Sequence, residues 1–165
     1  MDINCSYPFT PMIVGKEVIL RPLLQCTLSY CGRTFETMLL VDSGADYSML
    51  KREVARDGLM MDLDKLVPVG TTGGVGGETK IALVDVGVSF MMGKYRHECT
   101  IPFQISLDEG KDPGFSLLGR IPFFYDFRVG FRMGFTDDPS LGKFNLHLEQ
   151  KKRSSEKYKK PVKFG

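Results

Sequence analysis

Asp42 and Ser43 carry a carboxylate and a hydroxyl, which are groups able to take part in a reaction. They and Gly44 follow directly on four apolar residues. Residues 38–41 predict a strand buried on both faces, since a short apolar run bounded by a turn signal is typical of such strands. An ionised Asp at the end of a buried strand costs free energy unless it is paired or hydrogen-bonded. Gly44 permits a tight loop with close backbone approach. Asp42 is therefore a candidate acid or base, although a turn-capping role would explain the tripeptide considered alone.

A second candidate site is a glycine cluster. It consists of Gly73, Gly74, Val75, Gly76 and Gly77. A phosphate-binding loop needs Lys and then Ser or Thr after its last glycine, and here Glu78 follows. A dinucleotide-binding turn needs glycine at its sixth place and a helix afterwards, but Thr79 holds that place and a strand is predicted to follow. Two interpretations remain, a plain flexible loop and a hairpin tip that closes over an extended ligand.

Three stretches, taken in order, resemble the retropepsin-like aspartic proteases. Val41-Asp42-Ser43-Gly44-Ala45-Asp46 resembles the active-site loop of that family. The glycine cluster begins 31 residues after Asp42 and is similar to the family's flap. Leu117-Leu118-Gly119-Arg120 resembles the apolar segment that packs beside the catalytic loop and leads into a helix. The resemblance covers roughly residues 23–135.

The resemblance implies an aspartic endopeptidase that hydrolyses peptide bonds in extended polypeptides and needs no metal or cofactor. Asp42 would be the catalytic residue, and Ser43 and Gly44 would support its loop. Ala45, Asp46 and the glycine cluster would border the substrate. Arg120 would pair with Asp46, and Gly119 would pack beside the loop.

Aspartic proteases activate water between two carboxylates, so a second acid is required. Asp85 precedes Val86 and Gly87, but Val86 lacks the supporting hydroxyl. We therefore interpret Asp85 as an exposed strand position. The chain supplies one half-site, and a homodimer with a second copy of itself is expected.

Composition is ordinary for a globular protein, with 42% hydrophobic and 25% charged residues among 165. We expect an N-terminal arm at 1–17, one protease domain at 18–149 and a basic tail at 150–165. Neither a signal peptide nor a membrane span is expected, which favours a cytoplasmic protein without a membrane partner. Four cysteines in such a chain favour reduced thiols.

Short alternating segments separated by turns predict an all-β fold, a small closed barrel with one or two short helices. We expect a hairpin turn at 30–33, a helix from Ser48 to Arg56, a helical turn at 121–126 and a final hairpin over 127–148. The spacing of Cys26, Cys31, His97 and Cys99 does not match zinc sites, so core packing is expected for His97 and Cys99.

Two alternatives to the endopeptidase remain. The first is a peptide-binding module that keeps the fold with little or no hydrolysis. The second is a nucleic-acid-binding protein that uses residues 151–165, which contain seven Lys or Arg and one Glu. That tail lacks an aromatic platform beyond Tyr158 and Phe164, so nucleic acid is not an expected partner.

Overall fold

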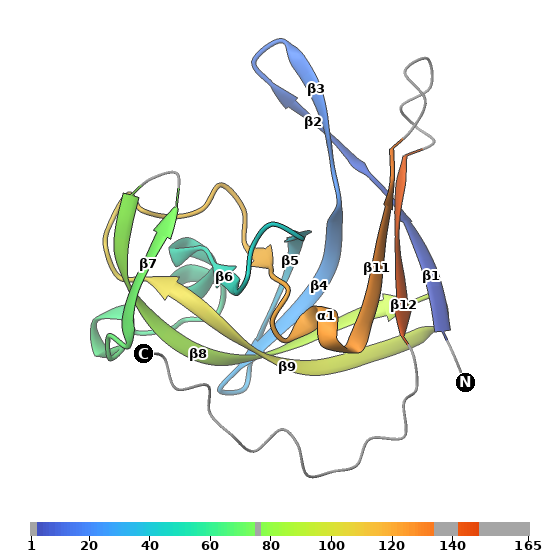
Figure 1. The fold of residues 1–165 in the computed structure, drawn as a ribbon. Helices are drawn as coiled ribbons and strands as arrows, with labels where there is room; N and C mark the ends of the chain where they lie inside the picture. The colour runs from blue at the N-terminus through green and yellow to red at the C-terminus, as the bar shows by residue number, and fades with distance from the viewer. Residues whose placement is uncertain (1–2, 75–76, 134–141, 149–165) are drawn as a thin grey trace.

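Six strands close into a barrel in the computed structural model, which describes residues 3–74, 77–133 and 142–148 (Figure 1). Hydrogen-bonded neighbours follow the order β4 (Leu23–Tyr30), β5 (Arg33–Val41), β10 (Leu117–Leu118), β6 (Ser48–Leu50), β9 (Tyr95–Ser106) and β8 (Gly77–Met92). Pairing of β8 with β4 closes the ring. The prediction of an all-β closed barrel with few short helices is confirmed.

The barrel is filled from the inward faces of its long strands. On β8, every second residue from Ala82 to Phe90 is buried, which is the period of two expected for a strand. Leu28, Leu39 and Phe103 are 0% exposed and belong to the same hydrophobic cluster. Burial of each such side chain contributes about 1.5–3 kcal/mol, so this interior is the main stabilising feature of the fold.

The connection between β4 and β5 is the predicted two-residue turn. Tyr30 pairs with Arg33, and between them Cys31 and Gly32 have φ angles of 45° and 77°. Two consecutive positive φ angles match the twist of a β-hairpin. The hairpin delivers β5 to Asp42.

The expectation that β5 is buried on both faces is wrong. Leu39 and Val41 are 0% and 2% exposed, whereas Met38 is 38% exposed and Leu40 is half-buried. Successive side chains of a strand point to opposite faces, and only one face of β5 points into the barrel. The run of apolar residues suggested burial on both faces because the outward-facing residues, Met38 and Leu40, are also apolar.

The predicted N-terminal arm at 1–17 contains two whole strands, β1 (Ile3–Pro8) and β2 (Thr10–Val14). β1 pairs with β12 (Lys143–Leu148), which in turn pairs with β11 (Phe127–Arg132). β1 is ordered because alternate residues pack inward, and the ring of Tyr7 stacks on Phe144 with centroids 5.1 Å apart. The predicted final hairpin is present as β11 and β12.

A separate hairpin follows, made of β2 (Thr10–Val14) and β3 (Glu17–Arg21). Within the described chain these two strands form a sheet by themselves. Figure 1 shows the hairpin projecting from the body of the molecule in blue.

The predicted helix from Ser48 to Arg56 is wrong in its first half. Ser48 starts β6, which pairs with β9, and its side chain is 0% exposed. The hydroxyl accepts a hydrogen bond from the Gly119 N–H at 3.1 Å, so it caps β10 rather than a helix. Helical conformation begins at Arg52, and the helical turn η1 covers Val54–Gly58.

Three elements remain. They are η2 (Leu63–Lys65), β7 (Gly70–Gly74) and α1 (Phe123–Asp126). α1 is the predicted helical turn. His97 packs on Phe127, with ring centroids 5.0 Å apart. No helix among the described residues is both long and apolar enough to cross a membrane.

Candidate active site

Asp42 lies where β5 leaves the barrel, between two neighbouring strands. Leu40 pairs with Leu23 on one side and with Leu117 on the other. The Asp42 N–H then donates to the Leu118 carbonyl at 3.0 Å. Strand pairing and this hydrogen bond thus fix the main chain of Asp42, from which the side chain extends into the site.

The carboxylate of Asp42 is oriented by its own loop. The Gly44 N–H donates to Asp42 Oδ1 at 2.8 Å, the hydrogen bond of an Asx turn. A Cβ on Gly44 would lie 3.2 Å from that oxygen, tighter than an ordinary contact. Asp42 is half-buried and Ser43 is exposed, so both side chains are accessible to another molecule.

The segment after the acid runs alongside the third sequence motif. The Arg120 N–H donates to the Ala45 carbonyl at 2.9 Å, and the Ile121 N–H donates to the Asp46 carbonyl at 2.8 Å. A Cβ on Gly119 would lie 2.4 Å from the carbonyl atoms of Tyr47. Only glycine allows this approach, which explains why the motif has glycine there.

Arg120 and Asp46 form an ion pair at the rim of the site, from guanidinium Nη2 to carboxylate Oδ1. Their side chains are 52% and 59% exposed. Exposed pairs of this kind contribute about 0–1 kcal/mol to stability, so its main effect is to orient both groups.

The glycine cluster lies at the end of a hairpin formed by β7 and β8. Gly74 pairs with Gly77, whose φ of 88° favours glycine. The Thr71 hydroxyl donates to Glu78 at 2.6 Å across the two strands. Val75 and Gly76 lie outside the described residues.

A polar network at the base of this hairpin was missed by the sequence reasoning. Thr79 is 4% exposed, and its hydroxyl lies 2.8 Å from that of Ser106 and 3.0 Å from Asp108 Oδ2. The same carboxylate oxygen accepts from the Lys80 N–H at 2.9 Å. The Lys80 N–H and the Thr79 hydroxyl hold the pKa of Asp108 below its ordinary value. The sequence offered one signal of this network, because Thr79 is a polar residue at a buried position of β8.

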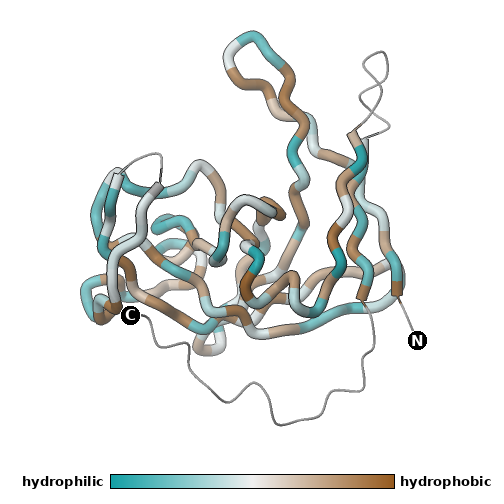
Figure 2. The backbone as a smooth tube through the Cα atoms, viewed as in Figure 1, coloured by the Kyte–Doolittle hydropathy of each residue, from teal (hydrophilic) through white to brown (hydrophobic). Residues whose placement is uncertain are grey.

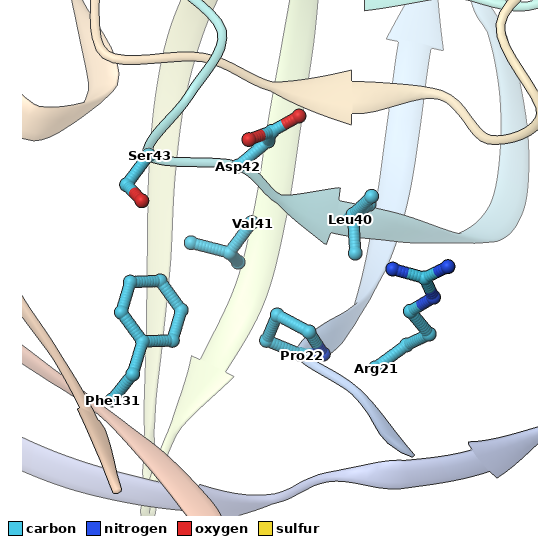
Figure 3. Close-up of a pocket in the computed structure, with 7 residues that line it drawn as sticks. All are labelled: Arg21, Pro22, Leu40, Val41, Asp42, Ser43 and Phe131. Atoms are coloured by element: carbon cyan, nitrogen blue, oxygen red, sulfur yellow. The ribbon is translucent and has the colours of Figure 1, made fainter. Parts of the chain in front are cut away.

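A depression of about 230 Å³ lies beside the Asp42 loop (Figure 3). It is lined by Arg21, Pro22, Leu40, Val41, Asp42, Ser43 and Phe131. Arg21, Pro22 and Phe131 were not predicted as site residues, because β3 and β11 reach the loop only through tertiary folding. The depression is thus built from three separate parts of the chain.

Over the residues that the structure describes, no second carboxylate is hydrogen-bonded to that of Asp42. Within the described part of the chain, the Gly44 N–H is the only hydrogen-bond donor to the Asp42 carboxylate. Asp85 is exposed in the middle of β8, which is where the sequence reasoning placed it. The described residues also contain no cluster of three or more His, Cys, Asp or Glu side chains that could hold a metal ion.

The barrel, the acid-bearing loop and the glycine-rich hairpin are those of a retropepsin-like fold. The chain is similar to the crystal structure of a retropepsin-like aspartic protease from Rickettsia conorii, with a TM-score of 0.51 and 23% identity. The match covers 87% of this chain and 98% of that one. At this identity the likeness shows the fold. No model of a known protein family matches the chain, and no curated protein matches it.

Proposed function

We propose that this protein is an aspartic endopeptidase that hydrolyses peptide bonds in extended polypeptides as a homodimer. The observation that carries the proposal is the placement of Asp42 at the end of β5, with its main chain fixed by Leu118 and its carboxylate oriented by Gly44. This arrangement belongs to a retropepsin-like barrel that also carries a glycine-rich hairpin. An acid held in this way by backbone and loop hydrogen bonds is preorganised for chemistry.

In the proposed reaction, two Asp42 carboxylates from two copies hold a water molecule and share one proton. Like charges about 3 Å apart do not both ionise, so one carboxylate is charged and the other neutral. The charged group takes a proton from water, and the water oxygen attacks the peptide carbonyl carbon. The neutral group gives its proton to the carbonyl oxygen. The C–N bond then breaks as the nitrogen takes the proton that the first carboxylate removed from water, and one hydroxyl of the intermediate returns a proton to the second carboxylate. The two apparent pKa values belong to the pair.

The other predicted residues support this reaction. The exposed Ser43 hydroxyls would meet across the two-fold axis, and Gly44 would keep each loop tight. Ala45 and Asp46 would border the peptide, with Arg120 and Gly119 holding that edge. Gly73, Gly74, Val75, Gly76 and Gly77 would cover the peptide from the opposite side.

A peptide-binding module without hydrolytic activity is the second candidate. This alternative is favoured because each chain supplies Asp42 alone as a candidate catalytic acid. A monomer therefore has half of the catalytic dyad. Such a module would bind extended peptides and release them unchanged.

The variant Asp42→Asn tests the proposal in a peptide-library cleavage assay from acidic to neutral pH. Cleavage should be abolished while the fold and dimer persist, because the amide cannot act as a base. Asp85→Asn is the matched control, since it removes an exposed carboxylate on β8. Normal cleavage by Asp42→Asn would overturn the proposal, and peptide binding without cleavage by the wild type would favour the binding module.

A further inference from the structure

The β2–β3 hairpin exposes apolar side chains at its end. Ile13 is 80% exposed, Val14 53% and Val18 66%, and Ile13 pairs directly with Val18. Figure 2 shows hydrophobic colouring on the strands of this projecting hairpin and hydrophilic colouring at the turn between them. Among the described residues this hairpin pairs with no third strand, and an isolated two-stranded hairpin is marginally stable in water. Exposed apolar surface of this kind is typical of a site that binds another molecule.

The base of the hairpin is firmly held, in contrast to its end. Phe9 precedes β2 and Leu23 follows β3, and both are 7% exposed. The Phe9 N–H also donates to the Gly142 carbonyl at 3.1 Å. The hairpin is therefore an arm with a fixed direction, about 17 Å long at 3.4 Å per residue.

The base of the arm adjoins the candidate active site. Arg21 and Pro22, where β3 ends, line the depression that contains Asp42. Phe131 of β11 lines the same depression and is 42% exposed, and Met133 beyond it is 67% exposed. The base of the arm and the exposed end of β11 thus flank Asp42.

We infer that the β2–β3 arm and the exposed end of β11 form the docking surface for a second copy of this chain. The inference rests on the proposed function, because a partner that completes the Asp42 dyad must come within reach of both elements. Fully burying an apolar side chain of this size removes roughly 100 Å² from water. Five on each of two copies supply on the order of 1,000 Å², the minimum expected of a specific interface. A two-fold dimer uses the same patch on both copies, as this surface allows.

The test is the molecular mass in solution, measured by sedimentation equilibrium on the full chain over a range of concentrations. The double variant Ile13→Lys/Val18→Lys places charges at the end of the arm. The matched control is Met60→Lys/Val67→Lys, which changes two apolar residues that are 66% and 74% exposed elsewhere. Circular dichroism and melting temperature establish that both variants fold.

The wild type and the control should be dimers, and the arm variant should show a dissociation constant raised at least 100-fold. Its cleavage activity should return at high protein concentration. An arm variant that dimerises like the wild type, or a wild type that is monomeric at these concentrations, would overturn the inference. Mass is independent of catalysis: a dimer that depends on the arm but cleaves nothing would refute only the proposed function. Cleavage dependent on Asp42 by a dimer indifferent to the arm would refute only the docking surface.

Discussion

The two regions that face a substrate in the proposed enzyme are held in different ways. The Asp42 loop is fixed by main-chain hydrogen bonds to residues 118–121 and by strands on both sides of β5. In the described chain, β7 pairs only with β8, and this hairpin is anchored at its base by Thr79 and Asp108. The backbone of the acid is therefore held by strands on both sides, whereas the cover is anchored near one end, by the β8–β9 pairing that begins at Ile81 and by a few side chains. Changes at the loop should abolish activity, and changes at the hairpin base should loosen the cover.

The largest effect is expected for Gly119→Ala. Its Cβ would lie 2.4 Å from the Tyr47 carbonyl atoms, so backbone must move and the loop shifts with it. Overpacking against backbone should cost about 3 kcal/mol of unfolding free energy, and a displacement of about 1 Å should lower kcat about 100-fold. Chemical denaturation and peptide cleavage measure both.

Gly114→Ala is the control for this substitution, because a Cβ there meets nothing within 4 Å. Wild-type stability and activity in Gly119→Ala would show that the Asp42 loop tolerates displacement. The proposed difference between a fixed Asp42 loop and a loosely held β7–β8 hairpin would then be wrong.

A smaller effect is expected for Thr79→Val at the base of the hairpin. The change removes a buried hydroxyl that joins Ser106 to Asp108 and should cost about 1–3 kcal/mol, because polar partners lose a hydrogen bond. Thr79→Ser keeps the hydroxyl and should retain most of the stability. KM should rise more than kcat falls, since the cover and not the acid is affected. An equal loss of kcat without a change in KM would contradict this assignment.

The smallest effect concerns pH and Asp108. Its pKa in the folded protein lies below the ordinary 3.8, because the Lys80 N–H and the Thr79 hydroxyl favour the ionised carboxylate. A lowered pKa stabilises the fold fully above the ordinary value, and this stabilisation is lost as pH falls through the lowered pKa. The melting-temperature difference between wild type and Asp108→Ala should therefore be constant at neutral pH and shrink below about pH 4. A difference that grows in acid would reverse the sign of the interaction.

Local patterns were sufficient to predict the barrel, since turns such as Cys31-Gly32 and the alternation along β8 are encoded by neighbouring residues. The expectation of an N-terminal arm at 1–17 did not include the pairing of β1 with β12, where Tyr7 packs on the distant Phe144. Ser48 was predicted to cap a helix because its partner, the Gly119 N–H, is 71 residues away. Hydrogen bonds across such distances have no local signature.

The candidate site shows the same division. Asp42 and Gly44 are recognisable because an Asx turn joins residues two apart. Arg21 and Phe131 are not recognisable, because only the folded chain brings β3 and β11 to the acid. The proposed docking role of the β2–β3 arm likewise depends on the exposure of Ile13 and Val18. Their residue types alone do not show whether these side chains are exposed or buried.

The decisive measurement is the cleavage rate of mixtures of wild type and Asp42→Asn at constant total protein, after subunit exchange is complete. If each copy supplies one acid, mixed dimers are inactive and the rate falls with the square of the wild-type fraction, to about a quarter in an equal mixture. A rate that falls in direct proportion, to about half in an equal mixture, would show that one chain carries out the reaction alone and would contradict the proposed dyad.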